Sequence, residues 1–375
     1  MKKILNVDHI HRGKTNWEGK APMMVIPPAI RELLDLNDKH VRLFLKKKNV
    51  RKVSRALHPT EIIVLKCMDG RIHLPIMTET PLGIITPYRN LGARFDLAWP
   101  LFQNSIAEVV KYSTSRGRKV LVIVTYHYSR GSKHRGCAGF GYNTKAAKKY
   151  AADLVKSFNQ MFKGTTLTAI LVGVETDLES LVLHGAGGQT IDLSKVKFTK
   201  AAAADKLLAK LYPKMAEDVR ADFQPLVEGN VRHIAKIRKS KRPIVKIHHN
   251  EKWLLLGRTF DWVHKPNQAL IVGPFNPHLE EPIELAAKVL LGNIKEGRIK
   301  SEKGVVLMAC ARYAENGWAR KMAVKKAEYL RNLALQVITE RVPELIQYLH
   351  VCSAVVDIHT RKVSLVKISK KITKV

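Results

Sequence analysis

Two cysteines and one histidine in the first half of the chain have the types and positions that a metal site needs. Cys67 ends the apolar run EIIVLKC, His127 ends the run RKVLVIVTYH, and Cys137 lies in the glycine-rich segment SRGSKHRGCAGFG. Two sulfurs and an imidazole nitrogen suit Zn²⁺, and three protein ligands leave a fourth position open for chemistry. The remaining cysteines, Cys310 and Cys352, lie in apolar runs of the second half. The set therefore indicates a catalytic zinc site with one zinc per chain.

The same three residues also allow a simpler interpretation, because a cysteine at a strand end is often a small buried apolar residue. The residues Asp69 and Arg71 favour the interpretation as a metal site. They follow Cys67 at i+2 and i+4, where the guanidinium can pair with the carboxylate and keep it ionised. Zinc lowers the pKa of a bound water to about 7, and Asp69 could accept a hydrogen bond from that water or hydroxide. We therefore predict catalytic roles for Asp69 and Arg71.

The elements that must position these residues alternate between strand and helix. Apolar runs predict strands at 61–67, 118–127 and 168–175, with a short partner strand at 179–185. Longer segments at 95–113 and 144–162 predict helices. This alternation indicates an α/β fold with a mainly parallel sheet. In such a sheet the carboxyl ends of the strands meet at one edge, where sites form.

The second half of the chain repeats this pattern in diverged form. Three pairs of segments align: 118–129 with 303–314, 148–158 with 325–335, and 167–183 with 349–365. In the second copy Arg312 stands where the first has His127, and nothing aligns with Cys67, Asp69 and Arg71. The metal chemistry is therefore predicted for the first copy alone.

Composition places the chain among ordinary globular proteins. It has 375 residues, 46% of them hydrophobic, which excludes wholesale disorder. Four scattered cysteines do not make a disulfide framework. No stretch approaches the ~20 apolar residues of a membrane helix, and the start, MKKILNVDHIHRGK, lacks the apolar core of a signal peptide. We expect no membrane association, and we expect the protein to lie in a reducing cytoplasm.

The chain is strongly basic, with 65 Lys and Arg against 32 Asp and Glu and a formal net charge of +33. Lysines crowd residues 43–55, 236–246 and 367–375. This charge can attract nucleic acid, an acidic protein or another anionic surface, or it can be a solvated basic surface. No zinc-finger, RNP or helix-turn-helix signature is present, so we expect no specific nucleic-acid partner.

The motif C-x-D-x-R (Cys67, Asp69, Arg71), followed by a histidine at a strand end and a cysteine in a glycine-rich loop, resembles the β-class carbonic anhydrases. The segment YRNLGA (88–93) is similar to the Arg-Asn loop of that class. More narrowly, TYHYSRGSKHRGCAGFG and LVGVETDLESLVLHG resemble the carboxysomal shell carbonic anhydrases, in which the β-type domain is duplicated and the second copy has lost its zinc site. The resemblance covers about residues 60–375.

The resemblance implies an α/β protein with duplicated β-carbonic-anhydrase-like domains and a small N-terminal segment. We expect a partly helical N-terminal segment at 1–55 and a catalytic zinc-binding domain at 56–196. A helical connector at 197–240 and a degenerate second copy at 241–375 would follow. The two copies would pair within one chain as a pseudo-dimer, and two such chains would form a homodimer.

The resemblance also implies how the site residues divide their work. Zinc would be held by Cys67, His127 and Cys137, while Asp69 orients the zinc-bound hydroxide and Arg71 fixes Asp69. The hydroxide would attack CO₂ to give bicarbonate and a proton. In some enzymes of the class the aspartate instead occupies the open zinc position, and this sequence does not decide between the two.

One ligand assignment has an alternative. His134 precedes Cys137 by three residues, the spacing usual in the wider β class, whereas His127 precedes it by ten. We prefer His127 because it ends a strand.

The function expected from these observations is a zinc lyase, a carbonic anhydrase. Two alternatives remain open: a carbonyl sulfide or CS₂ hydrolase that uses the same site, and a basic scaffold or nucleic-acid-associated protein with an inert fold. The expected location is the cytoplasm, with the carboxysome interior as the compartment that the resemblance adds. CO₂ and bicarbonate would be the substrates, and an acidic protein or shell component could be a partner.

Overall fold

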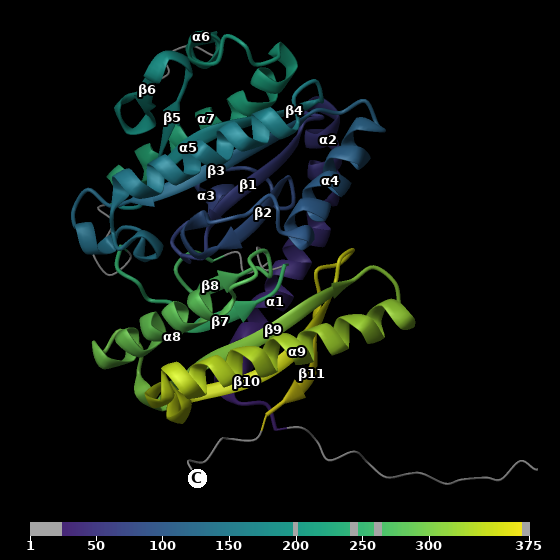
Figure 1. The fold of residues 1–375 in the computed structure, drawn as a ribbon, viewed down its shortest axis with the longest axis vertical. Coiled ribbons are helices and arrows are strands. Elements are labelled where there is room, and N and C mark those ends of the chain that lie inside the picture. Colours follow the sequence, from purple (N-terminus) through teal and green to yellow (C-terminus); the bar gives the residue numbers. More distant parts are fainter. Residues whose placement is uncertain (1–24, 198–201, 241–246, 259–264, 370–375) are drawn as a thin grey trace, which may run out of the picture.

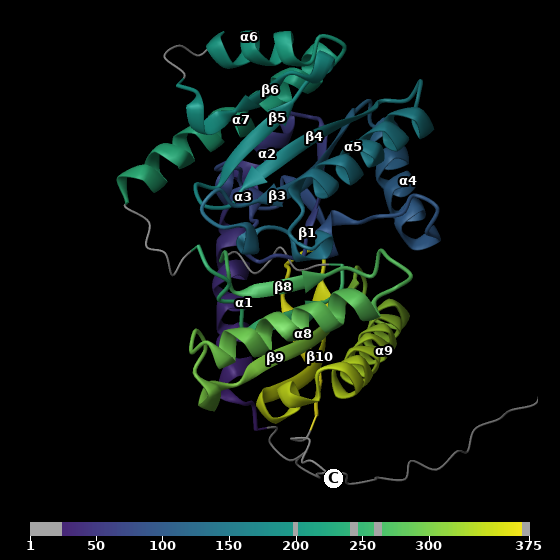
Figure 2. The same cartoon turned by 60° about the vertical axis from the view of Figure 1, so that its left-hand side comes forward.

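The computed structural model describes residues 25–197, 202–240, 247–258 and 265–369. They form two α/β bodies, each built around its own sheet, that lie one above the other in Figure 1. The view in Figure 2 shows the same division, with the first sheet in the upper body and the second in the lower. The predicted α/β fold is confirmed.

The first sheet has the strand order β2-β1-β3-β4-β5-β6. Its strands are β1 (Glu61–Cys67), β2 (Ile85–Asn90), β3 (Val120–Tyr128), β4 (Leu167–Glu175), β5 (Ser180–His184) and β6 (Thr190–Asp192). The first four strands run parallel, while β5 and β6 are antiparallel to their neighbours. Because β1 and β3 are parallel neighbours, their carboxyl ends lie at the same edge, and Cys67 and His127 are brought together there.

The second sheet repeats this topology, with the strand order β11-β10-β9-β7-β8. Its strands are β7 (Trp253–Leu256), β8 (Ala269–Val272), β9 (Val305–Tyr313), β10 (Leu349–Asp357) and β11 (Val363–Ile368). Strands β8, β7, β9 and β10 run parallel and β11 is antiparallel to β10. These strands match β2, β1, β3, β4 and β5 in both order and direction, as the predicted duplication requires.

Helices cover both faces of each sheet. They are α1 (Pro28–Lys46), α2 (Lys48–Leu57), α3 (Leu74–Met77), α4 (Pro100–Thr114), α5 (Thr144–Met161), α6 (Ala202–Leu211), α7 (Glu217–Lys239), α8 (Glu280–Lys295) and α9 (Trp318–Arg341). Along β1, Ile63 and Leu65 join the core under α4 and α5, while Ile62 and Val64 join the core under α7. Successive side chains of a strand point to opposite faces, so a strand covered on both sides is apolar throughout.

The helix predicted at 95–113 begins later than expected, at Pro100. The side chain of Asp96 accepts a hydrogen bond from the backbone N–H of Ala98 (2.8 Å), which forms a turn in place of a helical start. Proline then begins the helix, because its fixed φ suits the first turn and its missing N–H costs nothing there.

Helix α1 packs against the second sheet, although it comes before the first sheet in the chain. Ile30 and Leu33 are fully buried in the core of β7 and β9. The side-chain amide of Asn37 donates to the Arg361 carbonyl oxygen (3.0 Å), and its Oδ1 accepts from the Val363 N–H (2.9 Å). Figure 1 shows α1 beside the lower body.

The two bodies meet where the loop after β1 lies against the edge strand β8. The Ile271 N–H donates to the Met68 carbonyl oxygen (3.0 Å), and the Asn267 N–H donates to the Gly70 carbonyl oxygen (2.7 Å). The backbone that carries the predicted catalytic residues is therefore held by the second half of the chain.

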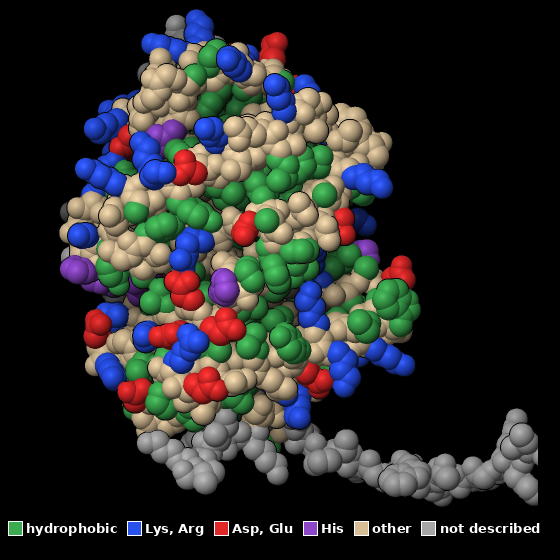
Figure 3. All heavy atoms as spheres, viewed as in Figure 1, with side chains coloured by type: hydrophobic (Ala, Val, Ile, Leu, Met, Phe, Trp, Pro, Cys, Tyr) green, Lys and Arg blue, Asp and Glu red, His purple; other side chains and the backbone are tan. Residues whose placement is uncertain are grey.

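Basic side chains are spread over both bodies on the face shown in Figure 3, with acidic side chains among them. On this face the net charge does not gather into one stripe. Among the described residues, none of the helices combines the length and apolarity needed to cross a bilayer.

Candidate metal centre

Cys67, His127 and Cys137 converge at the carboxyl edge of the first sheet. Each offers one ligand atom, and these three atoms lie within 4.8 Å of one another. Cys67 ends β1, His127 is the penultimate residue of β3, and Cys137 follows a short 3₁₀ turn at Lys133–Arg135. All three side chains are buried, with exposed fractions of 4%, 1% and 4%.

The glycine-rich loops allow this close approach. The backbone N–H of Gly92 donates to the Cys67 sulfur (3.3 Å). Gly92 has a φ of +62°, and a Cβ there would lie 2.7 Å from the ring of Phe140, in the loop that follows Cys137. Only a residue without a side chain both adopts this backbone conformation easily and leaves room for the neighbouring loop.

The three residues fit a zinc ion. A hydrogen bond with Cys137 lowers the pKa of the Cys67 thiol well below its usual range, and the same contact together with burial raises the pKa of Cys137. Both ring nitrogens of His127 are buried without a hydrogen-bond partner among the described residues. Buried polar atoms are normally satisfied, so an imidazole without partners beside two sulfurs has the donor set of a zinc centre with three protein ligands.

Asp69 and Arg71 form a buried pair beside these ligands. The guanidinium grips the carboxylate with Nε to Oδ1 (3.0 Å) and Nη2 to Oδ2 (2.6 Å), and the backbone N–H of Arg71 donates to Oδ1 (2.9 Å). Burial opposes ionisation, yet the Arg71 charge holds the pKa of the Asp69 carboxyl well below its usual range. Oδ2 lies 3.8 Å from Nδ1 of His127. The carboxylate is therefore an acceptor fixed next to the candidate ligands.

The remaining donors of Arg71 tie this pair to two other segments. Nη2 donates to the carbonyl oxygen of Arg135 (2.9 Å) and Nη1 to that of Ile247 (3.2 Å). One contact comes from the loop that carries Cys137, and the other comes from the second half of the chain. The orientation of Asp69 thus depends on both halves.

His249 and Glu251 also belong to the site, and the sequence analysis missed them. Nε2 of His249 lies 3.9 Å from Oδ2 of Asp69, and its Nδ1 hydrogen-bonds Glu251 Oε2 (2.9 Å). Glu251 is fully buried and also accepts from the Gly70 N–H (3.1 Å). The segment HHNE at 248–251 contains residue types that can form a polar site. It precedes a strand of the second half, however, and the rule that sites form at the carboxyl ends of parallel strands does not predict that it reaches the first sheet.

Asp69, His249 and Glu251 form a second group with ligand atoms within 4.8 Å of one another. Its carboxylates are already engaged, since Arg71 holds Asp69 and the Gly70 N–H and the imidazole hold Glu251. This group is therefore a hydrogen-bonded support of the site.

His134 lies outside the cluster. Its side chain is exposed, and its ring packs edge-on against Tyr142 with centroids 5.4 Å apart. The structure places His127, and not His134, beside the two cysteines.

Residues 55–244, just over half of the chain, match the family model of the carboxysome shell carbonic anhydrase catalytic domain. The chain is 25% identical over 241 residues to the carboxysome shell carbonic anhydrase of Prochlorococcus marinus, covering 54% of this chain and 46% of that protein. It is 30% identical over 134 residues to that of Halothiobacillus neapolitanus, covering 32% of this chain and 26% of that protein. The matched part therefore spans less than half the length of these curated relatives.

Among solved structures, the β-carbonic anhydrase CcaA aligns with a TM-score of 0.33 and 10% identity, over 43% of this chain and 91% of that one. The family match covers both the loop of Asp69 and Arg71 and the segment that joins His127 to Cys137. The chain belongs to the carboxysome shell carbonic anhydrase family.

Proposed function

We propose that this protein is a zinc-dependent carbonic anhydrase that interconverts CO₂ and bicarbonate, with zinc held by Cys67, His127 and Cys137. The observation that carries the proposal is the convergence of three buried ligand atoms within 4.8 Å, one of them on an imidazole without hydrogen-bond partners among the described residues. The names of the related proteins support the same activity.

Zinc, when bound, lowers the pKa of its water to about 7 and so supplies a nucleophile at neutral pH. Asp69 has the complementary role of an acceptor. Its carboxylate stays ionised because Arg71 holds it, so it accepts a hydrogen bond and keeps that donor in one orientation. Because both oxygens bind the guanidinium, Asp69 is also held back from the metal position.

His249 is placed to support this carboxylate from the other side. Its Nδ1 is tied to Glu251, which leaves Nε2 toward Asp69. The His249 side chain is 22% exposed, whereas Asp69 is 5% exposed. We propose that His249 positions Asp69 and connects it to the solvent side of the site.

The test combines metal content with CO₂ hydration, measured on the purified full chain by stopped flow with a pH indicator. The Cys67→Ala variant should lose its stoichiometric zinc and reduce activity by more than about 100-fold, beyond the loss typical of a mutated partner of a ligand. Cys310→Ala is the matched control, since Cys310 is a buried cysteine of β9 outside the site. It should keep one zinc per chain and full activity.

Two results would contradict the proposal. If the zinc-loaded wild type does not hydrate CO₂, the proposed activity is wrong. If Cys67→Ala keeps both its zinc and its activity, the assignment of Cys67 as a zinc ligand is wrong.

We also propose that the protein works inside a carboxysome, following the names of the related proteins, and that it forms the homodimer expected from the family resemblance. Light scattering of the purified protein should give twice the chain mass of 42.3 kDa. A fluorescent fusion in the native host should appear in the same puncta as a shell protein, and diffuse fluorescence would contradict the location.

A further inference from the structure

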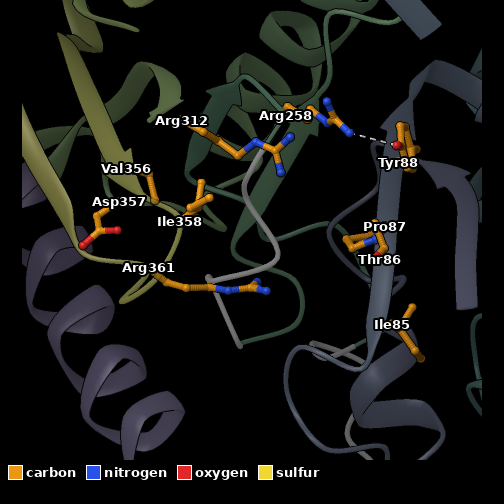
Figure 4. A pocket seen from close by; sticks show the side chains of 10 residues that line it. All are labelled: Ile85, Thr86, Pro87, Tyr88, Arg258, Arg312, Val356, Asp357, Ile358 and Arg361. Carbon is orange, nitrogen blue, oxygen red and sulfur yellow. Dashed lines mark hydrogen bonds between the residues drawn. The ribbon is translucent and has the colours of Figure 1, made fainter. Parts of the chain in front are cut away.

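A cavity of about 110 Å³ lies at the carboxyl ends of β7, β9 and β10, where the second body faces β2 of the first. Three arginines line it: Arg258 after β7, Arg312 on β9 and Arg361 before β11. Figure 4 shows Arg258 and Arg312 side by side, with Arg361 below them and the residues of β2 opposite. The cavity is separate from the metal centre and shares no residue with it.

The register of the two sheets shows what this cavity corresponds to. In the first sheet Leu65 of β1 pairs with Val124 of β3, and in the second sheet Leu256 of β7 pairs with Ala309 of β9. Val124 and Ala309 are equivalent, because each stands three residues before the aligned pair of the duplication, His127 or Arg312. Leu65 and Leu256 are therefore equivalent as well.

Two residues beyond these leucines stand Cys67 and Arg258. The second copy thus carries arginine at both strand ends where the first carries a predicted zinc ligand, Cys67 or His127. The cavity is the counterpart of the metal centre, with two fixed positive charges in place of two metal ligands.

The guanidinium of Arg258 is held in place by the first body. Its Nη2 donates to the Tyr88 hydroxyl oxygen (3.0 Å). Its Cζ lies 5.5 Å from the ring centroid of Tyr88 and 5.9 Å from that of Phe275, within range of cation–π attraction. These contacts orient the group, but they bring no negative charge.

Among the described residues, Glu108 of α4 is the carboxylate whose charge acts on Arg312, and its effect is smaller than those of burial and of Arg258. Burial and the positive charge of Arg258 lower the pKa of Arg312 to about 10. Asp357 lines the cavity, yet its oxygens accept from the His359 N–H (2.8 Å) and the Thr360 hydroxyl (2.9 Å), and Figure 4 shows its carboxylate turned away from both arginines. Positive charges packed this closely repel unless an anion lies between them.

We propose that this cavity binds a small oxyanion between Arg258 and Arg312, with Arg361 on the third side. The planar fork of a guanidinium matches two oxygens of a phosphate, sulfate, bicarbonate or carboxylate group, which is the geometry that arginine recognises best. One water needs about 10–15 Å³ of cavity space, so a cavity of about 110 Å³ has room for a small oxyanion.

The test is isothermal titration calorimetry of the zinc-loaded full chain with inorganic phosphate, at constant ionic strength set with NaCl. We expect one saturable site per chain. The Arg312→Gln variant should bind phosphate at least tenfold more weakly than the wild type. Arg312→Lys keeps the positive charge but loses the planar guanidinium, so its affinity should lie between those of the wild type and Arg312→Gln. Titrations with sulfate and with bicarbonate then identify the preferred oxyanion.

Two controls separate this cavity from the basic surface and from the metal centre. Arg116→Gln removes an exposed guanidinium that packs on Tyr112, and its affinity should stay within twofold of the wild type. Cys67→Ala should also leave the affinity unchanged, because it alters only the metal centre. Thermal melts of each variant confirm that it is folded.

Several outcomes would overturn the proposal. One is the absence of saturable binding for all three oxyanions. Another is an affinity of folded Arg312→Gln and Arg312→Lys equal to that of the wild type. A third is a loss of affinity in Arg116→Gln as large as the loss in Arg312→Gln. Loss of phosphate binding in Cys67→Ala would show that the anion binds at the metal centre and would reject the cavity as the binding site.

Discussion

Oδ2 of Asp69 lies 3.9 Å from Nε2 of His249, so the second half of the chain reaches the carboxylate beside the candidate metal centre of the first. The Glu251 carboxylate holds His249 from behind (2.9 Å) and also binds the loop backbone at Gly70 (3.1 Å). The second half of the chain therefore takes part in the candidate site of the first. It supplies His249 and Glu251, two side chains that lie against the loop of Asp69.

The first prediction concerns His249→Gln. This change removes the imidazole that faces Asp69, so we expect CO₂ hydration to fall about 10- to 100-fold, the loss typical of a mutated partner of a metal-site residue. Zinc content should stay at one per chain. His248→Gln alters the neighbouring histidine and should keep full activity. Equal activity in the two variants would show that His249 plays no part.

The second prediction concerns Asp69→Asn, which leaves the buried Arg71 without its counterion. Breaking a buried pair in this way typically costs about 3–5 kcal/mol. Urea denaturation should show a loss of this size, together with lower activity. Asp153→Asn breaks the exposed pair with Lys149 (2.7 Å) and should change the free energy of unfolding by less than about 1 kcal/mol. Similar costs for both variants would argue against a buried Asp69–Arg71 pair.

The third prediction tests the packing of the two bodies. In Gly70→Ala the new Cβ would lie 2.6 Å from the Ala269 carbonyl oxygen and 2.9 Å from Cγ of Glu251. The loop must shift and carry Asp69 with it, so we expect about 1–3 kcal/mol of destabilisation and reduced CO₂ hydration. Gly292→Ala in α8 meets no atom within 4 Å and should be neutral or stabilising by about 0.4–1 kcal/mol. A neutral Gly70→Ala would contradict the contact.

The fourth prediction is a pH dependence of stability. Burial, with a smaller effect of the Lys148 charge, lowers the pKa of His184 to about 4 from its ordinary value of 6.5. Between these values the unfolded chain binds a proton that the folded protein does not, so the free energy of unfolding falls as the pH drops from 6.5 toward 4. Urea midpoints measured across this range should fall less steeply for His184→Gln than for the wild type.

The control for that measurement is His278→Gln, which alters an exposed histidine. Its midpoints should follow those of the wild type at every pH. Equal slopes for His184→Gln and the wild type would mean that His184 titrates alike in the folded and unfolded states.

Much of the first sheet could be predicted from the sequence, because parallel strands buried on both faces leave long apolar runs such as the one that ends at Cys67. The meeting of Cys67 and His127 follows from the same rule, since neighbouring parallel strands end at one edge. The late start of α4 was missed because it depends on a local turn at Asp96 and on Pro100, against a segment whose composition favours a helix.

The contributions of the second half were out of reach for a different reason. His249 and Glu251 reach the site only because the loop after β1 lies against β8, and no periodicity along the chain encodes that contact. Arg258 escaped alignment because β7 is a strand of four residues without a motif. Its equivalence to Cys67 appears only in the pairing of strands.

The position of α1 has a consequence for how the protein is made. Ile30 and Leu33 leave the ribosome long before their partners on β7, which begins at Trp253. At about 5–20 residues per second, translation leaves this apolar helix face uncovered for an interval on the order of tens of seconds. The second body can therefore complete its core only after β7 is made, by packing against a helix that precedes the whole first sheet in the chain. Nascent chains stalled before residue 253 should therefore be the species that chaperones hold.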